Sequence, residues 1–327
     1  MGDGTRIEWT DATWNPVTGC TKVTAGCDHC YAETIAHRFA GTPAYPHGFD
    51  VTLRPERLVQ PLRWTKPRRV FVNSMSDLFH KDVPDEFIAR VWAVMALAPR
   101  HTFQILTKRH GRMRALLDDP AFRQNVWDAM RARYRERVKA IPGPHPSPEL
   151  TLPLPNVWLG VSVENQQTAN MRIPALMETP AAVRWVSCEP LLGPLDLRLA
   201  ETTTECTCSP YYGAHERHCG IEPGEWSDLD WVVVGGESGT GARPMHPEWA
   251  RSLRDQCQRA GVPFLFKQWG EWAVTGIPSR SAAWVFLDGT VESFKAGDLS
   301  ADVLMRRVGK KAAGRHLDGR TWDEYPS

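Results

Sequence analysis

The chain has 327 residues, enough for one large α/β domain or two smaller ones with a substantial core. Its 39 Lys and Arg nearly balance its 38 Asp and Glu, so no overall positive field demands a nucleic-acid partner. The sequence shows no apolar run before a cleavage site and no stretch of about eighteen apolar residues, which predicts a soluble, cytoplasmic protein. In that compartment the eight cysteines are expected to be reduced, which favours metal binding over disulfides.

The first feature along the chain is a Gly-rich loop that contains Cys20, Cys27 and Cys30, spaced C-x6-C-x2-C, before a helix-like segment at 31–40. A structural zinc site needs four closed ligands, whereas three thiolates can hold an iron–sulfur cluster that leaves one iron open. The loop supplies three sulfurs and no obvious fourth. We therefore favour the open cluster, and the alternative is a zinc site completed by His29 or His37.

Short apolar runs, rich in β-branched and aromatic residues, recur along the chain and predict buried strands. The runs begin at Val70, Thr102, Val157, Val183, Leu229 and Pro263. Helix patterns lie between them at 84–98, 121–139, 166–178 and 247–260. This alternation predicts a parallel sheet with helices outside it.

A further strand at 51–53 and one before the cysteine loop bring the count to about eight βα units. We therefore predict an α/β fold, a (β/α)8 TIM-type barrel that is closed or nearly closed, over residues 1–274. An open doubly wound sheet is the alternative. No G-x-G-x-x-G follows a strand, which weakens the dinucleotide-binding version of that alternative.

Polar side chains follow the predicted strands where each strand ends, as Asp77 and Arg109 do. The carboxyl ends of barrel strands converge on one mouth, onto which the cysteine loop would open. These residues are therefore ligand candidates, although any one of them could only cap the following helix. The candidates for cofactor binding are Asn73, Ser74, Lys108, Ser162, Glu164, Glu189 and Glu237.

Two later regions depart from the strand and helix rhythm. A cysteine-containing insertion at about 200–226 offers possible zinc ligands, Cys206, Cys208, His218 and Cys219, although a metal-free insertion is as plausible. From residue 275 the rhythm stops, and Asp288-Gly289 predicts a hairpin turn. We expect residues 275–327 to be a C-terminal extension with β-structure that covers the barrel.

Several long strings resemble a phage-associated family of unknown function, whose members look like divergent radical S-adenosylmethionine (SAM) proteins. The strings include Phe71-Val-Asn-Ser-Met-Ser-Asp-Leu-Phe-His, Val186-Ser-Cys-Glu-Pro-Leu-Leu-Gly-Pro and Phe266-Lys-Gln-Trp-Gly. The resemblance implies that Cys20, Cys27 and Cys30 hold a [4Fe–4S] cluster whose fourth iron binds SAM. An electron donor such as flavodoxin or ferredoxin would reduce the cluster, which would cleave SAM to a 5′-deoxyadenosyl radical.

Two departures from the usual radical SAM loop stand out. The first cysteine gap is six residues instead of three, and His29 occupies a position that is usually aromatic. The resemblance favours a radical SAM enzyme that modifies or repairs a base of DNA or RNA. The alternatives are a radical SAM enzyme acting on a small molecule and a zinc-stabilised, non-catalytic protein that binds nucleic acid or protein. Possible phosphate contacts are Arg63, Lys66, Arg68, Arg69, Arg306, Arg307, Lys310 and Lys311.

Overall fold

The computed structural model describes residues 5, 7–139, 149–199, 226, 228–277, 279, 281–295 and 302–326. The chain divides into two compact units. Unit 1 comprises Met1–Ser162, Glu178–Ser187 and Gly239–Gly241, and unit 2 comprises Val163–Met177, Cys188–Ser238 and Ala242–Ser327. Among the described helices, none has the length and apolar character that a membrane crossing requires.

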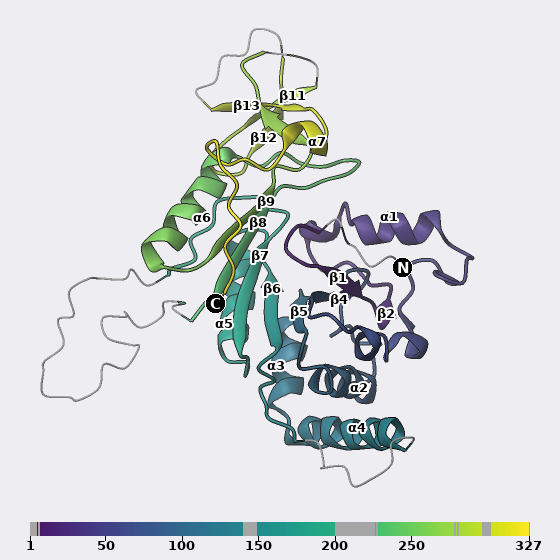
Figure 1. Ribbon diagram of the computed structural model, residues 1–327. Helices are drawn as coiled ribbons and strands as arrows, with labels where there is room; N and C mark the ends of the chain where they lie inside the picture. Colours follow the sequence, from purple (N-terminus) through teal and green to yellow (C-terminus); the bar gives the residue numbers. More distant parts are fainter. Residues whose placement is uncertain are drawn as a thin grey trace, which may run out of the picture. The chain divides into compact units, whose positions relative to one another are not determined.

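The main sheet has seven strands in the order β1-β4-β5-β6-β7-β8-β9 (Figure 1). Within each unit the recorded pairings of these strands are parallel, so the predicted α/β class is confirmed. The strands are β1 (Ala12–Trp14), β4 (Arg69–Val72), β5 (Thr102–Thr107), β6 (Val157–Ser162), β7 (Val183–Cys188), β8 (Trp231–Gly235) and β9 (Phe264–Gln268).

The sheet is open, because β1 and β9 stand at opposite ends of its strand order. The prediction of a closed eight-stranded barrel is therefore wrong. The segment predicted as a further strand is β3 (Thr52–Leu53), which pairs antiparallel with β2 (Val17–Thr18) in a separate two-stranded sheet. Arg54 gives the physical reason: its buried guanidinium donates to Thr18 Oγ1 at 3.2 Å and to the carbonyl of Pro43. These bonds hold β3 against β2.

Unit 1 also contains four α-helices among its described residues, which are α1 (Tyr31–Arg38), α2 (Asp85–Ala96), α3 (His110–Asp118) and α4 (Pro120–Val138). The predictions at 84–98 and 121–139 correspond to α2 and α4, which pack against each other, while α3 was not predicted. Asp119 caps α4 by accepting the Ala121 N–H at 2.8 Å, and Pro120 occupies the first turn.

Aromatic side chains pack on one face of the unit 1 strands. The ring of Trp9 lies 4.6 Å from that of Phe71 and 5.2 Å from that of Trp185, measured between centroids. Gln104, fully buried on β5, donates its amide to the Trp9 carbonyl at 3.3 Å. Gly160 on β6 leaves the space that the Trp185 ring fills.

In unit 2, α5 (Gln166–Met177) and α6 (Pro247–Ala260) match the helices predicted at 166–178 and 247–260. A four-stranded antiparallel sheet has the order β10-β13-β11-β12 and is followed by α7 (Lys310–Ala313). Its strands are β10 (Trp272–Val274), β11 (Ala282–Val285), β12 (Val291–Ser293) and β13 (Val303–Arg307). The pairing of β11 with β12 confirms the predicted hairpin.

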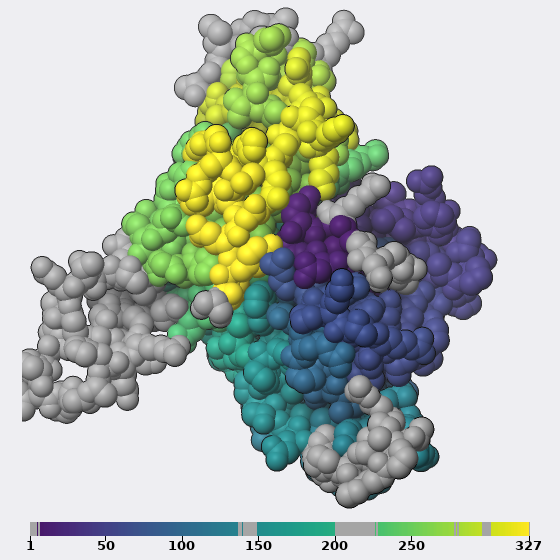
Figure 2. Space-filling view, viewed as in Figure 1, coloured from purple at the N-terminus to yellow at the C-terminus, as the bar shows by residue number. Residues whose placement is uncertain are grey.

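The C-terminal residues lie along β9 in the same unit. The Phe266 N–H donates to the Trp322 carbonyl at 3.0 Å, and the Trp231 indole donates to the Glu324 carbonyl at 2.8 Å. In the space-filling view this segment is the yellow surface over the green residues of unit 2 (Figure 2). It therefore runs antiparallel beside β9, the last strand in the sheet order.

Candidate cofactor site

The cysteine loop of unit 1 follows β2 and is hydrogen-bonded to Met75, just beyond the carboxyl end of β4. Gly19, directly before Cys20, donates its N–H to the Met75 carbonyl at 3.0 Å. Its φ is +87°, and a β-carbon there would stand 2.1 Å from the Asp50 carbonyl oxygen. Only glycine fits such a position, so Gly19 sets the backbone path from β2 to Cys20.

Arg109 holds Cys20 from the end of β5. Its Nη1 lies 3.4 Å from Cys20 Sγ and 3.1 Å from Asp77 Oδ2, while its Nη2 donates to the Thr21 carbonyl at 3.0 Å. Asp77 is fixed in turn, because it accepts the Thr107 hydroxyl at 2.8 Å and the Lys108 N–H at 3.0 Å. The strand ends and the thiol thus belong to one partly buried network.

Burial and, to a smaller extent, the Asp77 charge raise the pKa of the Cys20 thiol to about 11, although Arg109 acts to lower it. Burial also raises the pKa of Cys30, and the neighbouring Cys27 adds to the increase. Cys27 ends a 3-10 turn (Ala25–Cys27), and Cys30 immediately precedes α1. All three thiols are free and partly accessible.

Three free thiols on one loop are the right donor types for an iron–sulfur cluster. The described residues contain no group of three or more His, Cys, Asp or Glu side chains close enough to hold a metal ion. The donor types therefore suit a cluster, but the structure does not gather the three thiols into a metal site. The proposed zinc ligands Cys206, Cys208, His218 and Cys219 lie outside the described residues.

Asn73 directly follows β4. It combines a disfavoured backbone conformation with a buried side-chain amide. It is only 3% exposed and has φ +62°, a left-handed conformation that side chains disfavour. Within the described part of the chain, neither its Oδ1 nor its Nδ2 has a hydrogen-bond partner. Leaving a buried polar group unpaired costs roughly 1–3 kcal/mol. Such an amide at a strand end is typical of a place where a ligand binds.

The neighbouring polar residues of unit 1 have partners. Ser74 Oγ lies 3.2 Å from Asn15 Nδ2, and Asn15 Oδ1 accepts the Met75 N–H at 3.0 Å. Lys108 Nζ donates to Ser162 Oγ at 2.8 Å, across the adjacent strands β5 and β6. The structure thus brings Lys108 and Ser162 together, as their strand-end positions suggested.

In unit 2 each of the predicted acidic candidates is paired with a cation. Glu189 accepts Lys267 Nζ at 2.6 Å, Glu237 accepts Arg243 Nη2 at 2.7 Å, and Glu164 accepts Arg172 Nη1 at 3.1 Å. The sequence did not predict the arginine partners, because no residue spacing identifies them. The sequence predicted that Asp77 and Arg109 stand at strand ends, but it did not predict their hydrogen-bond network with Cys20.

The cations at 63–69 lie at the other end of β4 from Asn73. Arg69 is the first residue of β4 and forms an ion pair with Asp11 at 3.5 Å, and Arg68 stacks over Trp64 at 5.2 Å. At about 3.3 Å per residue, Arg69 is roughly 13 Å along the strand from Asn73. In unit 2, Arg306 and Arg307 lie on β13, and Lys310 and Lys311 lie on α7.

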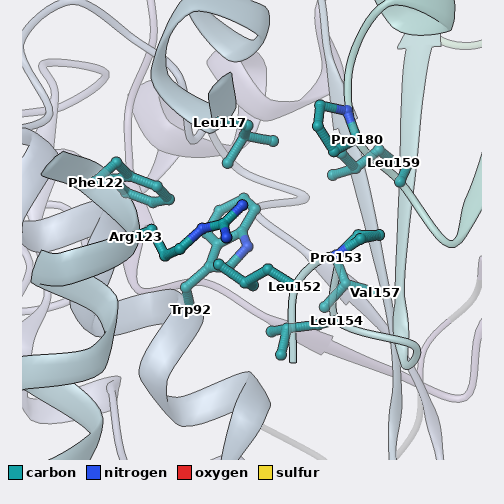
Figure 3. Close-up of a pocket in the computed structure, with 11 residues that line it drawn as sticks. Trp92, Leu117, Phe122, Arg123, Leu152, Pro153, Leu154, Val157, Leu159 and Pro180 are labelled. Carbon is teal, nitrogen blue, oxygen red and sulfur yellow. The ribbon is translucent and has the colours of Figure 1, made fainter. Parts of the chain in front are cut away.

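A separate pocket in unit 1 is lined mainly by apolar side chains. Figure 3 shows side chains from α2, α3, α4 and β6, including Trp92, Leu117, Phe122 and Leu159, with Arg123 beside them. No carboxylate, thiol or imidazole lines it among the described residues. It therefore offers no group for acid–base or metal chemistry.

Two solved structures resemble the chain weakly. A spore photoproduct lyase mutant matches over 88% of this chain and 69% of its own, at 10% identity and a TM-score of 0.34. Spore photoproduct lyase complexed with dinucleoside spore photoproduct matches over 86% and 67%, at 11% identity and a TM-score of 0.33. Scores this low do not establish a common fold. No curated protein matches the sequence. The family model described as "Protein of unknown function (DUF5131)" matches residues 4–326, so the chain belongs to that family.

Proposed function

We propose that this protein is a radical SAM enzyme whose Cys20, Cys27 and Cys30 hold a [4Fe–4S] cluster. The observation that carries the proposal is the attachment of the thiol loop to the carboxyl end of β4. The Gly19 N–H to Met75 carbonyl bond brings that loop to the same strand end as the unpartnered amide of Asn73. A loop with three free thiols and a buried amide without a hydrogen-bond partner among the described residues therefore adjoin in one unit.

Cys20, Cys27 and Cys30 would hold the cluster, which when bound would supply the one-electron chemistry that cleaves SAM. The residues of unit 1 would bind and orient the cofactor. Asn73 offers an amide donor and an acceptor for the amino acid or ribose part of SAM, and Lys108 offers a cation for its carboxylate. Glu189 and Glu237, the acidic residues that the sequence also suggested as SAM contacts, lie in unit 2, each beside its own cation.

The proposed substrate is a base or nucleotide of DNA or RNA. The support is the resemblance to radical SAM proteins together with the clusters of cations at 63–69 and 306–311. With a net charge of +1, binding should be weak and should fall steeply with salt. An enzyme that acts on a base must also extrude it from a duplex or accept single strands.

Anaerobic reconstitution with iron and sulfide tests the cluster. We expect about four irons per chain and a brown protein with absorption near about 400 nm. Incubation with SAM and dithionite should then release 5′-deoxyadenosine. A native protein that contains zinc as its only metal, or a reconstituted one that never cleaves SAM, would contradict the proposal.

Titration of labelled single- and double-stranded DNA and RNA at low salt tests the substrate. Each lost phosphate contact should lower the salt slope by about one when a Lys or Arg is changed to Ala. The absence of saturable binding to every nucleic acid, with the cluster intact, would favour a small-molecule substrate.

A further inference from the structure

We propose that Glu189, Lys267 and Gln268 form a binding site in unit 2 for the lactam edge of a nucleobase. This edge is the ring N–H beside a carbonyl oxygen that uracil, thymine and guanine carry. The inference rests on the proposed nucleic-acid substrate and names the part of it that the protein would recognise. All three residues belong to unit 2.

The three side chains meet at the carboxyl ends of neighbouring strands. Glu189 directly follows β7, and Lys267 and Gln268 are the last two residues of β9, with β8 between these strands in the sheet order. Gly235 ends β8, and a β-carbon there would stand 3.3 Å from the Glu189 carboxyl carbon. The glycine therefore leaves room for the carboxylate beside the end of β8. Ligands of α/β proteins bind at such strand ends.

One carboxylate oxygen holds both side chains of β9. Glu189 Oε1 accepts Lys267 Nζ at 2.6 Å and Gln268 Nε2 at 3.3 Å, and Glu189 Oε2 accepts Lys267 Nζ at 2.8 Å. These bonds orient the Gln268 amide, because turning it over would place its oxygen against the carboxylate. Since the lysine charge is matched by the carboxylate, the expected ligand is uncharged at this point of contact.

The oxygen of Gln268 is the unsatisfied member of this cluster. Gln268 is 3% exposed, and its Oε1 is buried without a hydrogen-bond partner in the part of the chain that the structure describes. A buried acceptor of this kind destabilises the folded chain unless a ligand supplies a donor. Beside it, Lys267 Nζ points two of its three N–H donors at Glu189, and the third remains for a ligand.

The ligand that complements these two groups carries an N–H next to a carbonyl oxygen, with both facing the same way. A trans peptide group directs its N–H and its C=O to opposite sides, so a polypeptide backbone does not present this edge. The ring of uracil, thymine or guanine holds the two groups on one side. The Lys267 and Glu189 side chains are 14% and 20% exposed, so a ligand reaches the cluster from the ion pair.

The hydrogen bonds already formed disfavour adenine. Glutamine reads adenine with both its amide groups, but Gln268 Nε2 already donates to Glu189. Lysine, in contrast, contacts the carbonyl oxygen of guanine. A carbonyl oxygen for Lys267 and an N–H for Gln268 are therefore the two features that the base should offer.

The test titrates the full-length wild-type protein with free nucleosides and follows the nucleoside signals by NMR, which detects weak binding. We expect uridine to bind, and 3-methyluridine, in which a methyl group replaces the ring N–H, to bind about tenfold more weakly. Adenosine and cytidine should also bind more weakly than uridine. Equal affinities for uridine and 3-methyluridine, or no binding of any nucleoside, would overturn the site.

Gln268→Met removes the acceptor but keeps a side chain of similar length, so the preference for uridine over 3-methyluridine should disappear. Gln258→Met is the matched control, because Gln258 also donates its amide to a carboxylate of unit 2, that of Glu324, but is exposed on α6. The control should keep the wild-type preference. If Gln268→Met does not fold, the two nucleosides compared on the wild-type protein still decide.

These titrations need neither iron nor SAM, so they fail independently of the proposed chemistry. A protein that cleaves SAM but does not distinguish uridine from 3-methyluridine would overturn this site and leave the radical SAM assignment intact. A protein that prefers uridine through Gln268 but never cleaves SAM would support this site and contradict that assignment.

Discussion

Arg172 Nη1 lies 3.1 Å from Glu164 Oε2, and the two side chains are only 2% and 1% exposed. Glu164 precedes α5 and Arg172 lies within it, so the pair ties the start of this helix to the preceding loop. Sequence reasoning placed Glu164 among the cofactor ligands because it follows a strand. In the structure its carboxylate already neutralises a buried cation.

This ion pair should control the stability of unit 2. Glu164→Gln removes the carboxylate and leaves the Arg172 charge buried, so we expect the free energy of unfolding to fall by about 3 kcal/mol. Urea denaturation measures the change. The double variant Glu164→Gln, Arg172→Met should lose less than the single one, because no charge is then stranded. Equal losses in both would show that the charge of Arg172 is not the cause.

Two variants of Asn73 distinguish the effect of its backbone strain on stability from its proposed role in binding SAM. Asn73→Gly relieves the positive φ and removes an unpaired buried amide, so it should raise the free energy of unfolding by about 1 kcal/mol. Asn73→Ala keeps the strain and should be less stable than the glycine variant. Both should lose SAM affinity, measured by calorimetry on the reconstituted protein. Unchanged affinity in both would remove Asn73 from the proposed cofactor site.

Gly160 and Trp185 occupy neighbouring strands and share one space. A β-carbon at Gly160 would stand 2.5 Å from the Trp185 ring, which is fully buried and packs against Trp9. Gly160→Ala should therefore destabilise unit 1 by about 1–3 kcal/mol through overpacking. Adding Trp185→Phe should recover part of that loss in denaturant titrations. A stable Gly160→Ala variant would mean that the ring shifts freely.

His246 should make unit 2 sensitive to acid. Its Nδ1 accepts the Glu248 N–H at 3.1 Å and caps α6, and burial lowers its pKa below the usual 6.5. The folded state therefore binds the proton less tightly than the unfolded chain, and stability falls as the pH drops below about 6.5. His246→Asn keeps a capping acceptor that does not titrate, so its unfolding free energy should fall less between pH 7 and pH 5. Urea midpoints across that range, identical for both proteins, would contradict the assignment.

The cysteine loop should lose its iron when one thiol is removed. Cys27→Ala leaves two thiolates, which cannot hold the cluster against solvent, so iron content should fall from about four per chain to near zero. Cys257→Ala is the control, because Cys257 is buried in α6 and lies outside the loop. Iron analysis after anaerobic reconstitution measures the iron content of both variants. Retained iron in Cys27→Ala would mean that the loop does not ligate the cluster.

Local signals in the sequence determined most elements of this fold. Helix α6 begins at Pro247 and ends before Gly261, whose φ is +67°, and the Asp288-Gly289 turn produced the expected hairpin. Strand and helix periods, caps and turns depend on residues within a few positions of one another. The thiol spacing and the strand-end polar residues are equally local, so the candidate residues were visible without coordinates.

The tertiary structure determines which side chains these candidate residues contact. Thr52–Leu53 pairs with Val17–Thr18 in a separate sheet, where Arg54 donates to Thr18, and the main sheet is open instead of a closed barrel. Arg109 is 89 residues from Cys20 in sequence, yet its guanidinium contacts the sulfur. Such pairings follow from the path of the whole chain and from which buried charges must be neutralised. No short-range pattern encodes them, so only the folded structure revealed which polar side chains are paired and which, like Asn73, have no hydrogen-bond partner among the described residues.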